Sequence, residues 1–335
     1  MSYRCSIYGL GVLTNKEIPG VPSSHVDSVD LNITLGSLPS WVNRVSTHRV
    51  ETTYTAEYFD ASGKPMLRVF RVLDGQYYHF QYADDTEFLV NSAGTEVFAN
   101  WNDPLTLEDT ATYLLGPVMG FVMLLRGVVC LHASAVAIGN QALAIVGPAG
   151  SGKSTTAAAL SARGYSVVAE DVVTLDDVGN HFLVQPAYPC IRLWPSSVKA
   201  LFGTETYLPK LTPNWNKCYL DLTKRPEQFQ QHSVELAAIY FLSPRSDTSA
   251  APLIEILDKS VGLMSLVANT YATKLMDKQM RAREFRLLTR VLNNVPLRRV
   301  TPHTSSLRIP DLCNRILDDF ATLTGSKAPE QVIHV

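Results

Sequence analysis

The sequence predicts a mixed α/β fold organised around a phosphate-binding loop, and three observations carry this prediction. A glycine-rich segment at residues 147–155, GPAGSGKST, fits the pattern G-x-x-x-x-G-K-[ST] and stands between an apolar run and helix-forming residues. The first hundred residues have the pattern of short strands, whereas the last part of the chain has a helical composition. We therefore expect a β-rich unit at residues 1–104, an α/β core at 105–258 and a helical region at 259–335.

Composition and charge limit the classes of partner. Hydrophobic residues make up 46% of the 335 residues and charged residues 18%, which is typical of a globular protein. The formal net charge of −2 gives no electrostatic basis for nucleic acid as the main partner. Five cysteines are scattered without C-x-x-C spacing, which indicates reduced, mostly structural thiols of a cytoplasmic protein.

No segment predicts export or a membrane span. The opening sequence, MSYRCSIYGLGVLTNKE, has no uninterrupted apolar stretch and no cleavage site of the signal-peptide type. The most apolar segment, Leu114–Leu131, is interrupted by Pro117 and Arg126, so its apolar pieces are too short to cross a bilayer. We expect a cytoplasmic protein without a membrane partner, in which this segment forms a buried helix followed by a strand.

The β-rich unit is predicted to consist mainly of antiparallel strands. Three runs alternate or cluster branched and aromatic residues, namely Val29–Ile33, Met66–Val72 and Tyr77–Tyr82. Asp74-Gly75 separates the last two runs, which predicts a hairpin at that point.

A helix and a second hairpin are predicted to lead into the glycine-rich segment. Thr106, with Asp109 three residues later, has the features of a helix N-cap. Gly139-Asn140 separates the strand-like run Val128–Ile138 from the apolar run Ala142–Val146, which predicts a hairpin. This hairpin differs from the parallel βαβ surroundings of the commonest phosphate-binding loops.

The glycine-rich segment has the residue types that a bound triphosphate needs. Its glycines allow positive φ, so that successive N–H groups point into one concavity. Lys153 adds a positive charge, and the Ser154 hydroxyl is the expected Mg²⁺ ligand at the positive end of the following helix. Nine residues are predicted to contact the nucleotide: Gly147, Pro148, Ala149, Gly150, Ser151, Gly152, Lys153, Ser154 and Thr155.

Two consecutive carboxylates follow the next strand. Helix-forming residues over Thr155–Arg163 end at Gly164, and Tyr165–Ala169 is predicted to be a second buried strand that ends at Glu170 and Asp171. Carboxylates at the end of a strand beside a phosphate loop are placed to bind Mg²⁺ or a nucleophile. The alternative is a solvated strand end without a function.

Further elements are predicted beyond this core. Gln185–Pro195, dense in proline and aromatic residues, predicts a shaped loop and a strand before a helix at Ser196–Phe202. Later strands are predicted at Trp215–Leu222 and Leu236–Leu242, helices over residues 258–293 and 311–323, and a loose tail from Thr324.

A cluster of basic residues lies within the predicted helical region. Lys278–Arg290 contains Arg281, Arg283, Arg286 and Arg290. Such a cluster forms either a solvated helix face or a contact with an acidic peptide or another subunit.

The region Val128–Leu175 resembles the catalytic core of bacterial HPr kinase/phosphorylase. The resemblance rests on Leu131-His132-Ala133, the hairpin, GPAGSGKS at 147–154 and GYSVVAED at 164–171. A weaker resemblance runs nearly the full length and includes Tyr8-Gly-Leu10 and PCIRLWP at 189–195. It is to the HPr-kinase-like proteins found with lasso-peptide and related peptide-modifying gene sets.

The resemblance implies an HPr-kinase-type core that uses ATP and Mg²⁺ to phosphorylate a serine. By position, Asp171 matches the carboxylate that takes the proton from the acceptor serine, His132 matches an active-site histidine, and Lys153 holds phosphate. The implied metal ligands are Ser154, Glu170 and Asp171. The implied acceptor is a serine-bearing precursor peptide, ribosomally made, or a small protein. HPr kinases assemble into oligomers, so the resemblance also implies a homo-oligomer.

The sequence departs from the family in two places. Pro195 stands at the spacing of the family's later Mg²⁺-binding glutamate, which puts the second metal contact and the reverse, phosphorylase reaction in doubt. The β-rich first unit is unlike the regulatory domain of the HPr enzyme, which argues against HPr as the substrate. Arg192 and Lys217 either bind phosphate or have structural roles.

Two other functions stay open at this point. The same core would serve a kinase that phosphorylates the hydroxyl of a small molecule such as an amino acid or a sugar. A non-catalytic module that binds ATP to regulate an interaction would need the loop and no catalytic base.

Overall fold

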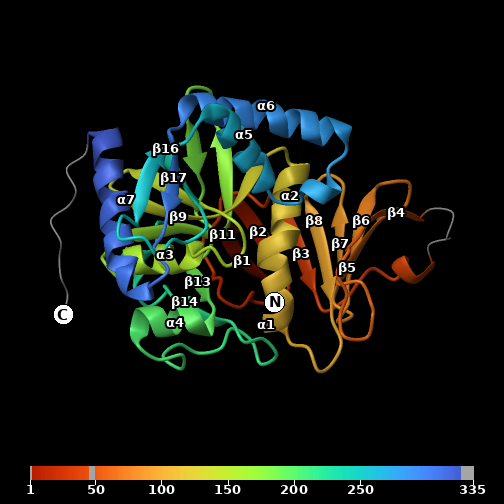
Figure 1. Cartoon of the computed structure of the whole chain (residues 1–335). Coiled ribbons are helices and arrows are strands. Elements are labelled where there is room, and N and C mark those ends of the chain that lie inside the picture. The colour runs from red at the N-terminus through yellow and green to blue at the C-terminus, as the bar shows by residue number, and fades with distance from the viewer. Residues whose placement is uncertain (1, 45–49, 326–335) are drawn as a thin grey trace. The chain divides into compact units, whose positions relative to one another are not determined.

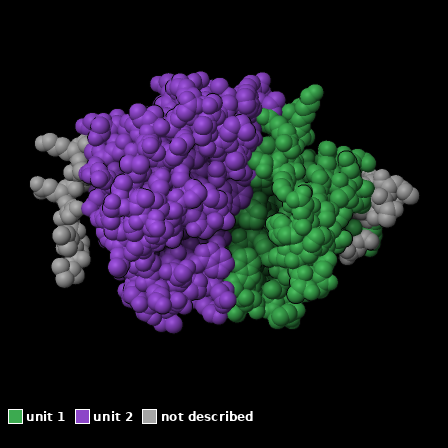
Figure 2. Space-filling model, viewed as in Figure 1, with its two compact units in different colours: residues 1–128, 212–215, 272–281 green, residues 129–211, 216–271, 282–335 purple. Residues whose placement is uncertain are grey.

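The computed structural model describes residues 2–44 and 50–325, and the chain divides into two compact units (Figures 1 and 2). Unit 1 comprises Met1–Val128, Thr212–Trp215 and Ala272–Arg281, and unit 2 comprises Val129–Leu211, Asn216–Tyr271 and Ala282–Val335. This division differs from the three parts expected from the sequence, because residues 105–128 belong to unit 1 and most of 259–335 belongs to unit 2. Residues 326–335 of the predicted tail lie outside the described part of the chain.

Unit 1 contains an eight-stranded sheet with the order β1-β2-β3-β8-β7-β6-β5-β4. The pairs β2–β3 and β3–β8 are parallel and the others are antiparallel, which confirms a β-rich first unit of mainly antiparallel strands. The strands are β1 Tyr3–Ile7, β2 Leu10–Thr14, β3 Leu31–Leu35, β4 Val50–Thr55, β5 Leu67–Val72, β6 Tyr77–Tyr82, β7 Glu87–Asn91 and β8 Glu96–Asn100. The hairpin predicted at Asp74-Gly75 joins β5 to β6, and both residues have positive φ there.

Unit 1 also contains helices, of which η1 lies between β3 and β4 and the others follow β8. They are the short 3₁₀ helix η1 Val42–Arg44, α1 Leu107–Tyr113, the π-helical turn η3 Leu114–Val118, which contains Pro117, and α2 Met119–Leu125. The predicted N-cap is confirmed, since the Thr106 hydroxyl accepts from the Asp109 amide and the Asp109 carboxylate accepts from the Thr106 amide. Phe121 of α2 is fully buried and contacts Tyr78 and Phe80 edge-on, so the predicted apolar helix covers the sheet.

Unit 2 is built on a seven-stranded sheet with the order β10-β9-β11-β12-β15-β17-β16, in which β10 also pairs with β15. Its strands are β9 Val129–Ile138, β10 Gln141–Val146, β11 Ser166–Asp177, β12 Phe182–Val184, β15 Val234–Leu242, β16 Leu253–Ile256 and β17 Leu297–Thr301. The hairpin predicted at Gly139-Asn140 is confirmed, because Ile138 faces Gln141 across the antiparallel pair β9–β10. On its other side β10 runs parallel to β15.

Helices pack on this sheet and connect its strands. They are α3 Lys153–Ser161, α4 Pro195–Phe202, α5 Lys259–Ala268, α6 Lys278–Asn294, which begins in unit 1, and α7 Ile309–Thr324. Short 3₁₀ turns lie at η4 Pro226–Gln228, η5 Thr273–Leu275 in unit 1, and η6 Ser306–Arg308. The core between α3, α7 and the sheet includes Leu143, Ile145, Tyr240, Ile316 and Phe320, all buried.

A small second sheet in unit 2 pairs β13 Cys190–Leu193 with β14 Cys218–Asp221. It packs with α4 and α3 around Ile191, Leu193 and Val198. The predicted order of loop, strand and helix over residues 185–202 is therefore confirmed. Arg192 lies on β13 and Lys217 immediately precedes β14, so this sheet brings two predicted cations to one place.

Two predictions about elements are wrong. The region 259–335 is not purely helical, because β17 lies within it and pairs in parallel with β15. Glu170 and Asp171 do not end a strand, because β11 continues through them to Asp177. The strand is bent at this point, since Asp171 has a φ of 71° and the pairing with β9 shifts register between Val167 and Ala169.

All five cysteines are free and buried. Among the described residues, no helix is both long enough and apolar enough to cross a bilayer.

Candidate active site

The glycine-rich loop joins β10 to α3 in unit 2. Its three glycines all have positive φ, with 155° at Gly147, 78° at Gly150 and 112° at Gly152, which is the N-cap of α3. A side chain at the first of these would not fit, since a Cβ on Gly147 would lie 2.9 Å from the Ser151 Oγ and 3.1 Å from the Leu242 carbonyl oxygen. The local sequence therefore fixes a tight turn whose backbone leads directly into a helix N-terminus.

Lys153 is folded into this loop. Its side chain is buried, and Nζ donates hydrogen bonds of 2.8 Å to the carbonyl oxygen of Gly147 and 3.1 Å to that of Pro148. Burial lowers the pKa of Lys153, although the carboxylates of Asp171 and Glu170 act in the opposite direction. The ammonium group is thus held inside the concavity by backbone oxygens, which phosphate oxygens would replace.

The other loop residues have different surroundings. Pro148 and Ala149 are exposed, whereas Ser151 Oγ is buried and has no hydrogen-bond partner among the described residues. Thr155 does not face the loop, because its Oγ1 donates a 2.8 Å hydrogen bond to Ser197 Oγ on α4. The unsatisfied Ser151 hydroxyl is the kind of group that a phosphate oxygen would satisfy.

Ser154 and Glu170 join the glycine-rich loop to the pair of consecutive carboxylates, Glu170 and Asp171. Ser154 Oγ donates a 2.7 Å hydrogen bond to Glu170 Oε1, and the Glu170 side chain is buried. A hydroxyl and a carboxylate are ligands that Mg²⁺ prefers, and the rest of its coordination normally comes from water and phosphate oxygens. The described residues hold no group of three histidine, cysteine or acidic side chains that would bind a metal without such help.

Arg192 bridges the two consecutive carboxylates. Its Nη2 donates to Asp171 Oδ2 at 2.6 Å, and its Nε lies 3.5 Å from Glu170 Oε2. Neighbouring side chains on a regular strand point to opposite faces. The left-handed φ of Asp171 breaks this alternation, which explains how one guanidinium reaches both acids.

Asp171 is the centre of a second group of contacts. His132 Nε2 on β9 lies 3.4 Å from Asp171 Oδ1, and burial together with the charge of Asp171 raises the pKa of Tyr271. Burial raises the pKa of Asp171, but Arg192, His132 and Lys217 together outweigh it, so that the pKa lies well below the usual range. The carboxyl group is therefore ionised throughout the neutral range.

Tyr271 reaches this place through backbone pairing with the start of β9. The His132 amide donates a 2.7 Å hydrogen bond to the Asn269 carbonyl, and the Tyr271 amide donates one of 2.9 Å to the Cys130 carbonyl. The rings of His132 and Tyr271 pack edge-on with centroids 5.7 Å apart. The position of Tyr271 is thus set by the strand that carries His132.

The sheet register fixes the spacing between the loop and Asp171. Ala133 on β9 pairs with Val146, which immediately precedes the loop, and on its other side with Asp171. Two steps between adjacent strands, each about 4.8 Å, put Val146 and Asp171 roughly 10 Å apart. The loop and the carboxylate are therefore held in one row of a hydrogen-bonded sheet.

Arg192 and Lys217, the two cations for which the sequence left phosphate binding and a structural role open, have different surroundings. Arg192 is buried against the two acids as described above. Lys217 Nζ lies 5.2 Å from the ring centroid of Trp194, and its charge helps to lower the pKa values of Asp171 and Lys153. Both cations thus belong to the electrostatic surroundings of the site. Pro195, at the spacing of the family's glutamate, opens α4 and offers no side-chain oxygen.

Two residues near the site were missed from the sequence. Tyr271 has no motif around it, and only its pairing with β9 shows its position. Arg245 follows β15, and its Nη2 lies 3.4 Å from the position that a Cβ on Gly152 would occupy. Because β15 runs parallel to β10, the segments that follow the two strands emerge at the same edge of the sheet. This pairing explains why Arg245 lies near the loop.

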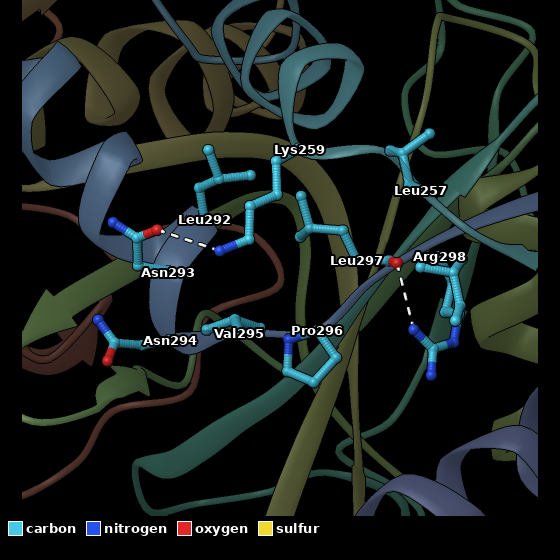
Figure 3. A pocket seen from close by; sticks show the side chains of 10 residues that line it. Leu257, Lys259, Leu292, Asn293, Asn294, Val295, Pro296, Leu297 and Arg298 are labelled. Atoms are coloured by element: carbon cyan, nitrogen blue, oxygen red, sulfur yellow. Dashed lines mark hydrogen bonds between the residues drawn. The ribbon is translucent and has the colours of Figure 1, made fainter.

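Two surface pockets lie apart from these residues. One of about 330 Å³ in unit 2 is lined by Ile256, Leu257, Lys259, Leu292, Asn293, Asn294, Val295, Pro296, Leu297 and Arg298 (Figure 3). The other, about 240 Å³ in unit 1, is lined by Trp41, Val42, Val50, Phe70, Val72, His79 and Gln81. Neither lining includes a residue of the loop or of the carboxylate group.

Comparisons with known proteins give a distant likeness among solved structures. No family model matches the chain. No curated protein matches it either. Among solved structures, the chain is similar to the HPr(Ser) kinase/phosphatase from Coxiella burnetii, with 15% identity, 57% of this chain and 97% of that chain covered, and a TM-score of 0.32. What this chain does is therefore inferred from its own residues.

Proposed function

We propose that this chain is a phosphotransferase that moves the γ-phosphoryl group of ATP to a serine hydroxyl. The observation that carries the proposal is the grouping of Lys153, the Ser154–Glu170 pair and the ionised Asp171 around one loop. A loop that only binds a nucleotide has no need of an acid held by a histidine and an arginine. Such an arrangement suits the orientation of an attacking hydroxyl.

In this proposal the loop and Lys153 bind the phosphate oxygens. Its amides would donate to them, and the Lys153 ammonium would exchange its contacts with the Gly147 and Pro148 carbonyls for contacts with phosphate. Ser154 and Glu170 would hold Mg²⁺, which supplies charge neutralisation for the transferring group. Arg192 keeps the two acids at a fixed separation from the loop.

Asp171 would receive the acceptor. The serine oxygen forms a bond to the γ-phosphorus while the bond from that phosphorus to the β,γ-bridging oxygen breaks and ADP leaves. The hydroxyl proton passes to Asp171 Oδ. A carboxylate with a strongly lowered pKa is a weak base, so its main contribution is to accept a hydrogen bond from the hydroxyl and to orient it.

For the acceptor we propose a serine of a ribosomally made precursor peptide or of a small protein. This choice follows the resemblance of the sequence to proteins of peptide-modifying gene sets. Phosphorylation of a free amino acid or sugar is the competing choice, and it would use the same residues in the same roles.

The decisive experiment combines the protein with ATP, Mg²⁺ and serine-bearing peptides, and measures phosphate incorporation by mass spectrometry. We expect a phosphopeptide with the wild type, retained ATP binding but no transfer with Asp171→Asn, and loss of ATP binding with Lys153→Ala. Free serine and sugars are included as competing acceptors. ATP binding without transfer to any of them would reject the kinase proposal in favour of a regulatory ATP-binding module.

A further inference from the structure

Three arginines of α6 and the pocket at its end lie on one helical stripe. Positions 283, 286, 290 and 293 are separated by three, four and three residues, a spacing that puts them on the same face of a helix. The first three are arginines, and the fourth, Asn293, lines the 330 Å³ pocket together with Asn294 (Figure 3). The arginine stripe therefore continues into the rim of the pocket.

The charge of α6 is strongly one-sided. Lys278–Asn294 contains five basic residues and one acidic residue, a net charge of +4 in a chain whose formal net charge is −2. The acidic residue, Glu284, is buried and offers little to solvent. Arg290 is engaged with Asp177 and with the Gly179 carbonyl oxygen, whereas Arg283 and Arg286 are exposed and have no ion pair among the described residues. Two guanidinium groups are thus free to meet an acidic partner.

Apolar surface accompanies the two arginines at the end of the stripe. The pocket at the end of α6 is lined by Leu257, Leu292 and Leu297 (Figure 3). Phe285 is 54% exposed but lies outside the stripe, since residues one or two positions apart on a helix do not share a face. Arginine is one of the residue types that dominate binding at protein interfaces.

We propose that this stripe, comprising Arg283, Arg286 and the pocket rim at Asn293, is a docking surface for an acidic peptide segment that carries an apolar residue. From residue 283 to residue 293 the helix rises about 15 Å, which an extended peptide spans with roughly five residues. The partner thus carries acidic side chains opposite the arginines and an apolar side chain about five residues away, in the pocket.

The choice of a peptide over other anionic partners follows from the chain. A nucleic acid would place many phosphates against a protein whose remaining charge is negative, while the stripe offers it the two exposed arginines Arg283 and Arg286. An anionic membrane needs an apolar helix face turned outward, but Leu288 and Val291 of α6 are buried in the protein.

The surface is physically connected to the strand that bears Asp171. Arg290, on the same stripe, binds Asp177 and the Gly179 carbonyl at the end of β11, six residues beyond Asp171 on that strand. The docked segment is therefore proposed to belong to the acceptor peptide, and in this respect the inference rests on the proposed kinase function. The binding itself does not depend on ATP.

The test measures binding of a fluorescent synthetic peptide to the full chain by anisotropy, without ATP. The peptide has three glutamates, a leucine five residues away and one serine, and two control peptides replace the glutamates by glutamine or the leucine by serine. We expect Arg283→Glu with Arg286→Glu to weaken binding at least tenfold and raised salt to weaken it too. The double variant Lys224→Glu with Arg225→Glu, which changes the same charge at exposed residues of η4 and its approach, should bind as the wild type does.

Four outcomes would overturn the docking surface. They are no binding, equal binding by both double variants, equal binding of the glutamine peptide, and displacement of the peptide by vesicles of anionic lipid or by single-stranded DNA that bind more tightly. Sedimentation of the protein alone tests for a second copy, since self-association abolished by the α6 variant would assign the stripe to that contact instead.

Docking and kinase activity can fail separately. In one case the wild type binds the peptide, the α6 variant does not, and neither phosphorylates the serine. That result supports the docking surface and rejects the proposed function. In the other case both proteins phosphorylate the peptide with the same KM. That result supports the proposed function and rejects the docking surface.

Discussion

The hydroxyl of Ser154 donates a 2.7 Å hydrogen bond to Oε1 of Glu170, so the first turn of α3 is joined to the middle of β11. This contact puts two side-chain oxygen atoms together beside the glycine-rich loop. If they hold Mg²⁺ in the nucleotide complex, Ser154→Ala should reduce the rise in Tm produced by ATP with Mg²⁺. ATP with EDTA should give the same, smaller rise in both proteins. An undiminished effect of Mg²⁺ in the variant would remove Ser154 from the metal site.

Arg192 is predicted to be a major determinant of stability. Its buried guanidinium holds two carboxylates, and removing one partner of a buried ion pair costs roughly 3–5 kcal/mol because the other charges are left uncompensated. We expect Arg192→Met to lower the free energy of unfolding by about that amount in urea denaturation. Glu170→Gln with Asp171→Asn in the same background should recover part of the loss. No recovery would show that the packing of Arg192, rather than its charge, stabilises the protein.

The lowered pKa of Asp171 predicts a pH dependence of stability. The unfolded carboxyl group titrates near 3.9, and the folded one titrates lower. Its contribution to stability is therefore present above the unfolded value and is lost as the pH falls through that value toward the folded pKa. The difference in the free energy of unfolding between the wild type and Asp171→Asn should be constant from pH 7 to pH 5 and shrink by pH 3. A difference independent of pH would contradict the assignment.

Tyr271 is predicted to be a positioning residue. Burial raises the pKa of Tyr271 well above its usual value, and the charge of Asp171 adds to this effect, so the phenol stays protonated and is predicted to donate a hydrogen bond to the carboxylate. A hydrogen bond to a charged group contributes about 1.5–3 kcal/mol, so Tyr271→Phe should lower kcat roughly 10- to 100-fold. The KM for ATP should not change, and the acid limb of the pH–rate profile should move to higher pH. An unchanged profile would leave Tyr271 with a packing role.

Gly147 is predicted to be intolerant of any side chain. A residue held in an unfavourable region of φ and ψ costs of order 1–3 kcal/mol, and the new Cβ of Gly147→Ala would also lie too close to Ser151 Oγ. We expect a lower Tm and weaker ATP binding. Gly139→Ala is the matched control, because Gly139 also has positive φ but no atom lies within 4 Å of the added Cβ. Its ATP affinity should equal that of the wild type.

The features that were predicted from the sequence have signals within a few residues. Gly139-Asn140 specifies a hairpin, Thr106 with Asp109 specifies a cap, and the glycines of the loop specify its turn. Each of these depends on local backbone chemistry, which a single sequence displays. The strand before the loop and the helix after it were predicted for the same reason.

The features that were not predicted depend on distant pairing. β17 contains Arg298 and Arg299 and has a weak strand pattern, and its conformation is set by pairing with β15 and by the contact of Arg298 with Asp319. Tyr271 comes to the site because residues near it pair with β9, more than a hundred positions earlier. Neither contact can be predicted from the neighbouring residues in the sequence, because both depend on tertiary pairing.

The turn at Gly139-Asn140 follows the end of β9, whereas the row that contains Ala133 crosses the middle of that strand. Five residues along a strand span roughly 17 Å, so the turn is well separated from the loop and from Asp171. It is therefore a suitable point for inserting a short tag or attaching a fluorophore. Such a label would report on the unfolding of the central sheet of unit 2 while leaving the phosphate loop chemically unaltered.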